Sequence, residues 1–256
     1  MSLNKSKIDY VWDPILTPAT GRRGHTHNIC TGCKHGCEFC YARRMVEEGR
    51  LKGHPAYPYG FAPTFHPERV RAFGGKPKVI FDGNMADYGG DWDWKNGGGP
   101  EYLTPNYSSD WIAREMVRFA LLNPQHIILL LTKNPAWYRF AEWPDNVWCG
   151  FSATNNEELF PRWKEILNHC DGRRTWISLE PWLDDDPPDY MLCAAWLVVG
   201  GLTGPNAKPV SAATRRWLWD SSIQAKRFTK ANVGWGGGQD CPREYPDSWK
   251  VNNATT

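Results

Sequence analysis

Four cysteines within one short segment constrain this chain more than any other feature. Cys30, Cys33, Cys37 and Cys40 lie within eleven residues, and the last three are separated by three and then two residues. Thiols this close cannot all pair in disulfides, because each pair would close a small and strained loop. We therefore expect them to bind a metal, and soft thiolates favour zinc or an iron–sulfur cluster.

The spacing bears on which metal is bound. A structural zinc site usually takes four ligands as two separated pairs, whereas these cysteines form one run. A four-iron cluster takes one ligand per iron, so Cys33, Cys37 and Cys40 would hold three irons and leave the fourth open to an outside ligand. Cys30 as a fourth ligand would instead complete an ordinary electron-transfer cluster. Both alternatives, zinc and a closed cluster, stay open from spacing alone.

Length and composition indicate a globular protein. The 256 residues suit one domain, and 41% of them are hydrophobic. No run of eighteen apolar residues predicts a membrane span, and the polar segment 1–7 lacks a secretory core, so we expect a cytoplasmic protein without a membrane partner. Eight cysteines in such a chain indicate metal binding or reactivity rather than disulfides. A net charge of +2 is too small to indicate nucleic acid by itself.

Short apolar runs alternate with helical segments along most of the chain. Strands are expected at 78–81, 126–131, 147–151, 175–179, 196–199 and 232–235. Strands buried on both faces and alternating with helices predict an α/β fold with a parallel sheet. About six or seven βα units give an incomplete TIM-type barrel that is open on one side. We expect this barrel to span 1–235, with a Gly- and Trp-rich insertion at 89–107 as a lid or mobile loop and an extension at 236–256.

Polar residues collect where the expected strands end. In barrels of this kind the chemistry lies at the carboxyl ends of the strands. The groups at those positions are Asp82–Asp87, Thr132-Lys133, Ser152–Asn155, Glu180 and Gly200–Gly204. The sequence thus predicts one site formed by the cysteine loop and these strand ends.

The cysteine motif closely resembles that of the radical SAM superfamily. It shares the three-then-two spacing, the aromatic Phe39 before the last cysteine, and Tyr41 with Ala42 after it. The sequences at 131–135, 150–152, 178–181 and 200–204 also resemble a bacteriophage and bacterial branch of unassigned activity. The resemblance covers about residues 25–235 and implies a partial βα barrel with the cluster loop after its first strand. It implies a [4Fe-4S] cluster and S-adenosylmethionine as cofactors, with reductive cleavage to a 5′-deoxyadenosyl radical that abstracts hydrogen from a substrate.

The resemblance also implies roles for individual residues. Cys33, Cys37 and Cys40 would hold the cluster. Asp82, Gly83 and Asn84 stand where the family often has Gly-Gly-Glu near the methionine amino group. The other expected cofactor contacts are Phe39 and Tyr41 near adenine, Ser152 and Thr154 at the ribose or methionine carboxylate, Glu180 at the ribose or substrate, and the Gly200-Gly201 turn beside a flat ring.

Two further residues are candidates for catalysis. Lys133 would hold a carboxylate or phosphate, or else simply extend into solvent. Cys241 lies in a Gly-rich tail and is a candidate radical relay, although isolated cysteines more often serve packing. A strand-end Ser such as Ser152 is equally often just the cap of the next helix.

The expected substrate is a modified nucleobase or an amino-acid-bearing nucleotide in phage DNA modification. One alternative is a mutase or isomerase acting on a free small molecule. Another is a non-catalytic module, stabilised by zinc or an iron–sulfur cluster, that binds nucleic acid. The resemblance further implies a low-potential electron donor of the flavodoxin or ferredoxin type as partner, and the cytoplasm of a host cell if the gene is phage-encoded.

Overall fold

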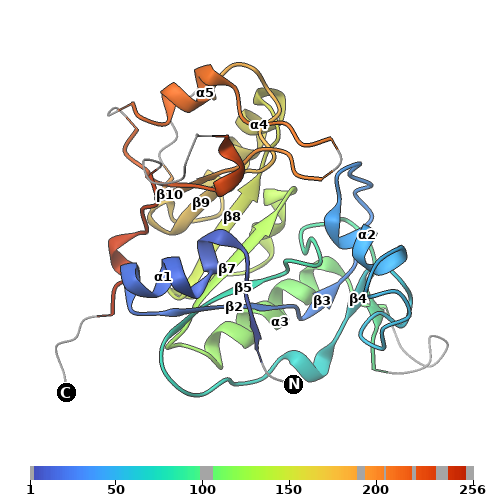
Figure 1. The fold of residues 1–256 in the computed structure, drawn as a ribbon. Coiled ribbons are helices and arrows are strands. Elements are labelled where there is room, and N and C mark those ends of the chain that lie inside the picture. The colour runs from blue at the N-terminus through green and yellow to red at the C-terminus, as the bar shows by residue number, and fades with distance from the viewer. Residues whose placement is uncertain are drawn as a thin grey trace.

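The protein is built on a curled eight-stranded sheet, as seen in a computed structural model (Figure 1). The structure describes residues 3–98, 106–188, 194–204, 206–220, 223–234 and 242–251. The sheet order is β1-β2-β5-β7-β8-β9-β10-β11. Its strands are β1 (Asn4–Lys5), β2 (Arg23–His27), β5 (Lys78–Asp82), β7 (Ile127–Thr132), β8 (Val147–Ser152), β9 (Thr175–Leu179), β10 (Trp196–Val199) and β11 (Lys226–Thr229).

The sheet is wound in one direction. β1 pairs antiparallel with β2. From β5 on, each strand of this sheet pairs in parallel with the sheet strand that comes before it in the sequence. Each new strand is added at the same edge of the sheet. Right-handed crossovers between such strands place the connecting helices on one face, as in a βα barrel. The sheet curls into a half-barrel and stays open in the described part of the chain, because its order ends at β1 and β11. The α/β prediction is therefore confirmed.

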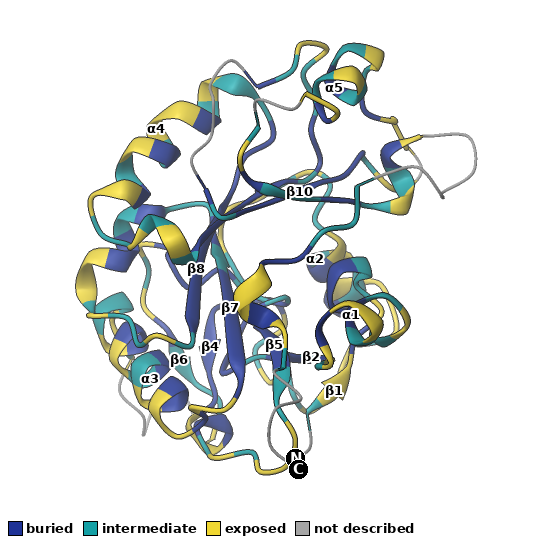
Figure 2. Ribbon diagram, turned by 90° about the vertical axis from the view of Figure 1, so that its left-hand side faces the viewer, coloured by how far each residue is buried: buried dark blue, intermediate teal, exposed yellow. Residues whose placement is uncertain are grey.

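Helices cover the convex face of this sheet. They are α3 (Ser109–Leu121), α4 (Asn156–Leu167) and α5 (Ala212–Trp217). The helix α2 (Tyr41–Glu47) instead packs beside the cysteine loop, in a small cluster with Phe61 and Met85. The connections also contain the 3₁₀ segments η2 (Pro67–Arg69), η4 (Pro135–Phe140), η5 (Gly172–Arg174) and η6 (Ala231–Val233). Figure 2 shows α3 and α4 beside the buried strands β7 and β8, each helix with its buried side turned to the sheet. Ile128 and Leu130 of β7 share this outer core with Ile112 and Met116 of α3.

The concave face is filled by large aromatic side chains. Successive residues of a strand point to opposite faces, so Phe81, Trp176, Trp196 and Phe228 all point inward and form a second core. Tyr10 is carried into this core by η1 (Asp9–Val11), which precedes α1 (Asp13–Thr20). Gly24 allows the approach, since a Cβ there would lie 1.8 Å from the carbonyl oxygen of Val11. The lower half of the barrel is thus a packed core rather than a channel.

The chain after residue 241 packs against the amino ends of the strands. Trp249 in η7 (Asp247–Trp249) is fully buried in the inner core. Nε of Arg22 donates to the carbonyl oxygen of Trp249 at 2.7 Å. The described part of the expected extension therefore closes the bottom of the half-barrel.

A small sheet lies beside the cysteine loop. It joins β3 (Cys30–Thr31), β4 (Thr64–Phe65) and β6 (Lys95–Asn96). β6 belongs to the insertion expected at 89–107, of which residues 99–105 lie outside the described part. Trp94 is fully buried in the outer core, so the described part of the insertion packs onto the domain instead of standing over it as a lid.

The last strand differs from the prediction. The strand expected at 232–235 is replaced by β11 at Lys226–Thr229, and Asn232 lies in η6. In the segment Lys-Arg-Phe-Thr, Phe228 and Thr229 are buried while Lys226 and Arg227 are only partly covered. An edge strand of this kind lacks the continuous apolar run on which the prediction relied.

Candidate active site at the mouth of the half-barrel

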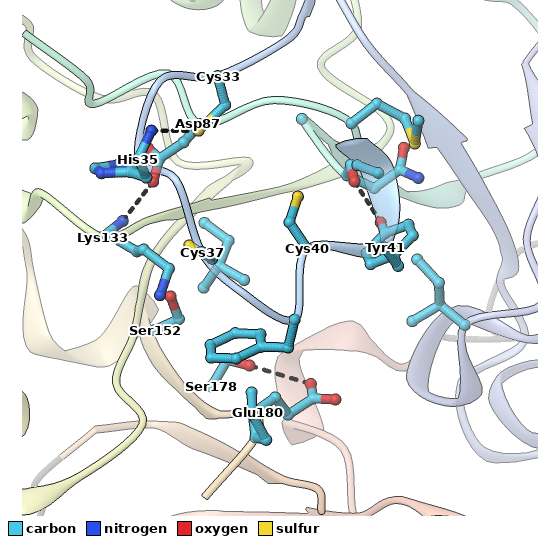
Figure 3. Close-up of a pocket in the computed structure, with 18 of the residues that line it drawn as sticks. Cys33, His35, Cys37, Cys40, Tyr41, Asp87, Lys133, Ser152, Ser178 and Glu180 are labelled. Atoms are coloured by element: carbon cyan, nitrogen blue, oxygen red, sulfur yellow. Dashed lines mark hydrogen bonds and ion pairs between the residues drawn. The ribbon is translucent and has the colours of Figure 1, made fainter. Parts of the chain in front are cut away.

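A cavity of about 310 Å³ opens at the carboxyl ends of the parallel strands. It is lined from one side by the cysteine loop and from the other by the strand ends (Figure 3). The predicted site residues that line it are Cys33, Cys37, Phe39, Cys40, Tyr41, Gly83, Asn84, Lys133, Ser152, Glu180 and Gly201. Tertiary structure thus brings together most of the residues chosen from sequence.

Strand geometry decides which residues reach the cavity. Side chains alternate between the faces of a sheet, and the inward series continues past the aromatic core toward the mouth. It runs from Trp176 and Ser178 of β9 to Glu180, the first residue after that strand, and from Phe228 of β11 to Lys230, the first residue after that strand. Ser178 and Lys230 were not chosen as site residues from sequence.

The cysteine loop is fixed to its surroundings by backbone hydrogen bonds. Gly32 donates to the carbonyl oxygen of Met85 at 2.9 Å and has a φ of 84°. A Cβ at Gly32 would lie 2.3 Å from the carbonyl oxygen of Ala62, so only glycine fits this turn. The amide of Cys33 then donates to the carbonyl oxygen of Phe61 at 3.2 Å. These bonds hold the first cysteine at the edge of the cavity.

Two of the three cavity sulfurs accept backbone hydrogen bonds. The amide of His35 lies 3.4 Å from Sγ of Cys33, and the amide of Arg43 lies 3.3 Å from Sγ of Cys40. Burial raises the pKa of the Cys33 thiol to about 12 in the metal-free protein. Amide donors stabilise a sulfur that carries negative charge, so the loop is suited to hold thiolates once a cation offsets their burial.

Cys30 lies apart from the other three cysteines. It is fully buried in β3, where it packs in the outer core with Ile29, Phe65 and Tyr88, and it does not line the cavity. Within the described residues, no group of three His, Cys, Asp or Glu side chains is placed to hold a metal ion. The other three cysteines of the loop all line the one cavity.

Asp87 links the cysteine loop to the end of β7. Its carboxylate accepts hydrogen bonds from Thr132 Oγ1 at 2.6 Å and the amide of Lys133 at 2.8 Å, and Nε2 of His35 lies 2.9 Å away. Burial alone would raise the pKa of Asp87, but these hydrogen bonds and the His35 charge outweigh it and lower the pKa. The ammonium of Lys133 lies 5.5 Å from the centre of the Phe39 ring. Sequence reasoning placed Asp87 in a polar strand end but missed this linking role.

The loop after β5 contacts the start of α2. The hydroxyl of Tyr41 donates to the carbonyl oxygen of Asn84, and Nδ2 of Asn28 donates to Oδ1 of Asn84 at 2.9 Å. Gly83 has a φ of 92°, a conformation that favours glycine. Gly83 and Asn84 both line the cavity, and the two oxygens of Asn84 already accept hydrogen bonds within the protein.

Glu180 and Lys230 form an ion pair at the mouth. Nζ of Lys230 lies 2.6 Å from Oε1 of Glu180, and Ser178 Oγ donates to Oε2 at 3.1 Å. Burial alone would lower the pKa of Lys230, but the charge of Glu180 outweighs it and raises the pKa. A Cβ on Gly200 would lie 3.0 Å from Oε1 of Glu180, so this glycine leaves room for the carboxylate although it does not line the cavity.

Two other predicted residues, Asp82 and Thr154, lie away from the cavity. Asp82 points to the outer face, where it bonds His27, the amide of Ile29 and the hydroxyl of Tyr88. Thr154 bonds Glu158, with its hydroxyl 3.0 Å from Oε2, and does not line the cavity. Cys241 lies outside the described residues.

Fold and site together define a parallel α/β half-barrel with a cysteine-rich loop at the mouth. Residues 22–236 match the model of a family described as "Protein of unknown function (DUF5131)", and the chain belongs to that family. No curated protein and no solved structure matches the chain. No described helix is long and apolar enough to cross a membrane.

Proposed function

We propose that this protein is a radical SAM enzyme. One observation carries the proposal: the three cysteines of the spaced motif and the polar ends of successive parallel strands line one cavity at the barrel mouth. When bound, a reduced [4Fe-4S] cluster with one open iron supplies the electron that cleaves S-adenosylmethionine to methionine and a 5′-deoxyadenosyl radical. The partial βα barrel of the radical SAM kind, over residues 1–235, is part of the same proposal.

The donor set suits a cluster with an open iron. Cys33, Cys37 and Cys40 are free thiols that line the cavity, and two of their sulfurs already accept amide hydrogen bonds. Cys30, which would close the fourth position, is held in the core by β3 pairing with Phe65. Three ligands and one open iron thus agree better with this arrangement than four ligands do.

The remaining cavity residues would position the nucleoside and exclude water. The walls carry Phe39, Tyr41 and the backbone of Gly83 and Asn84, and Ser152 offers a hydroxyl from β8. The aromatic core seals the cavity from below, since Phe81 and Trp176 fill the inner face. Enclosure of this kind protects a reactive intermediate from side reactions. Lys133, held over Phe39, would contact a carboxylate or phosphate.

The substrate class that we propose is a nucleobase or an amino-acid-bearing nucleotide, as in phage DNA modification. A low-potential flavodoxin- or ferredoxin-type protein would deliver the electron in the cytoplasm. The strand-end sequences that resemble the phage branch support this substrate class, and they line the cavity at Lys133, Ser152 and Glu180.

The test is anaerobic reconstitution with iron and sulfide, followed by dithionite and S-adenosylmethionine. We expect about four irons per chain and formation of 5′-deoxyadenosine. Cys37→Ala should lose both, whereas Cys170→Ala, which removes a free thiol outside the cavity, should retain both. Stoichiometric zinc and no 5′-deoxyadenosine from the reconstituted protein would refute the proposal. Nucleic-acid binding that falls steeply with salt and ignores S-adenosylmethionine would favour the binding-module alternative.

A further inference from the structure

The cavity has a second side, which lies away from the cysteine loop. Figure 3 shows Ser178 and Glu180 across the cavity from Cys33. This side is completed by Lys230 from the end of β11 and Tyr10 from η1. The family match begins at residue 22, so Tyr10 comes from a segment before the matched region.

The Glu180–Lys230 pair has unused hydrogen-bonding capacity. An ammonium has three N–H groups and a carboxylate about four acceptor positions. Among the described residues, Lys230 Nζ bonds Glu180, and Glu180 accepts from Lys230 and Ser178. The side chains of Glu180 and Lys230 are 18% and 23% exposed. The pair therefore presents an available donor and an available acceptor side by side to the cavity.

The Tyr10 hydroxyl lacks a partner in the described part of the chain. Tyr10 is 3% exposed, and its ring centroid lies 5.7 Å from that of Trp196 and 5.8 Å from that of Phe81. Burial raises the pKa of this hydroxyl, and the charge of Glu180 raises it further. Tyr10 lines the cavity, so its hydroxyl can form a hydrogen bond with a ligand bound there.

The opposite charges of Glu180 and Lys230 indicate which kind of ligand can bind beside them. A carboxylate or phosphate would compete with Glu180 for Lys230, and an amine would compete with Lys230 for Glu180. Separating a partly buried ion pair leaves an uncompensated charge and is expensive. A neutral ligand with one donor beside one acceptor can instead bond both partners while they stay together. Phe39 and Phe81 also line the cavity, and aromatic walls of this kind favour a planar ring.

We infer that Tyr10, Glu180 and Lys230 form a substrate subsite for a neutral planar ring that carries an N–H beside a C=O. Glu180 accepts from the ring N–H, Lys230 donates to the ring carbonyl, and the Tyr10 hydroxyl bonds a further oxygen of the ring. Oxo-pyrimidine and oxo-purine bases have this lactam edge, either as free nucleosides or within a nucleic acid. The subsite specifies the substrate of the proposed function. That the ligand bound there is a substrate rests on the proposed function.

The experiment measures binding by calorimetry to the full-length protein without iron or S-adenosylmethionine. The probes are uridine and 3-methyluridine, which differ in the ring N–H. We expect uridine to bind at least about tenfold more tightly, because the methylated ring leaves the Glu180 oxygen without its donor. Equal affinities, or no binding of uridine, would overturn the inference. This comparison uses the unaltered protein, so it does not depend on the folding of a variant.

Variants then assign the preference to these residues. Lys230→Met and Tyr10→Phe should each reduce uridine affinity by about tenfold. Lys226→Met is the matched control, since Lys226 begins the strand that Lys230 follows but pairs with Asp247 at 3.4 Å and does not line the cavity. This variant should leave affinity unchanged. Thermal unfolding of each variant verifies folding. Unchanged affinity in a folded Lys230→Met protein would contradict the subsite.

Two further comparisons separate related outcomes. Tighter binding of an oligothymidylate than of thymidine would assign the ring to nucleic acid, and equal binding would assign it to a free nucleoside; both support the subsite. Failure to form 5′-deoxyadenosine would refute the proposed function and leave this binding result standing. Loss of the lactam preference in a protein that still forms 5′-deoxyadenosine would refute the subsite alone.

Discussion

Asp82 and His27 are joined on the outer face of the sheet, where Oδ2 of Asp82 lies 2.6 Å from Nδ1 of His27. The ring of His27 stacks on Phe119 of α3, with ring centroids 4.8 Å apart and an angle of 7° between the planes. The other carboxylate oxygen of Asp82 accepts from the amide of Ile29 at 3.2 Å and from the hydroxyl of Tyr88. Asp82 thus holds together the start of the cysteine segment and the end of β5 rather than contacting a ligand.

Asp82→Asn should destabilise the fold and leave the chemistry intact. An amide cannot accept all of these hydrogen bonds, so we expect the free energy of unfolding to fall by about 1–3 kcal/mol. Urea unfolding followed by fluorescence measures this loss. Asp185→Asn is the control, because the Asp185 side chain is 87% exposed and should matter by less than about 0.5 kcal/mol. If Asp82→Asn were as stable as wild type but bound S-adenosylmethionine poorly, Asp82 would belong to the cofactor site.

His66 should make stability depend on pH below neutrality. It is 3% exposed, and burial, followed by the charge of Arg69, lowers its pKa to about 3. In the unfolded chain the histidine pKa is about 6.5. As pH falls below that value the unfolded state takes up a proton that the folded state refuses, so stability present at pH 7 is lost progressively toward pH 3. Between pH 6.5 and pH 5 the loss is about 2 kcal/mol.

The matching variant is His66→Gln, which has no titrating ring and can still bond Thr31, whose Oγ1 lies 2.9 Å from Nε2 of His66. Urea unfolding at pH 7.5, 6.5 and 5.0 should show a shallower decline for this variant than for wild type. Identical slopes would mean that His66 takes up a proton as readily in the folded protein as in the unfolded chain.

Gly201→Ala should disturb the mouth of the barrel. The added Cβ would lie 2.7 Å from the carbonyl oxygens of both Asn232 and Lys208. It would also strain the bonds between Gly201 and the Asn232 side chain, at 2.6 and 3.3 Å. We expect a loss of about 1–3 kcal/mol in the free energy of unfolding. Gly74→Ala, where nothing lies within 4 Å, should be neutral or slightly stabilising, and a similar loss in both variants would argue against the steric explanation.

Cys30→Ala should retain the cluster that Cys37→Ala loses. Cys30 is fully buried in the outer core, whereas Cys37 lines the cavity. After anaerobic reconstitution we expect wild-type iron content and 5′-deoxyadenosine formation in Cys30→Ala, with a modest drop in thermal stability from the lost packing. Iron content and the absorbance of the cluster are the readouts. Loss of iron in a folded Cys30→Ala protein would make Cys30 a fourth ligand.

The sequence by itself determined the fold class and the position of the site along the chain. The spacing of Cys33, Cys37 and Cys40 predicted one ligand-bearing loop, and these residues do line one cavity. Apolar runs that end in polar residues predicted parallel strands with their polar ends at one mouth, because short-range patterns record which segments are strands and where each ends. At Lys226–Thr229, where the alternation is weak, the last strand was misplaced.

Tertiary structure alone decided which neighbouring residue faces the cavity and which distant residues join it. Strands buried on both faces carry apolar residues at every position, so the sequence lacks the two-residue period that marks the faces of a sheet. The sequence therefore does not show that Asp82 points to the outer face while Gly83 lines the cavity. Tyr10 and Lys230 lie 220 positions apart and share the cavity because η1 and β11 pack at the same open side of the curled sheet. No local pattern encodes that meeting, since it depends on how far the whole sheet curls before its edges are covered.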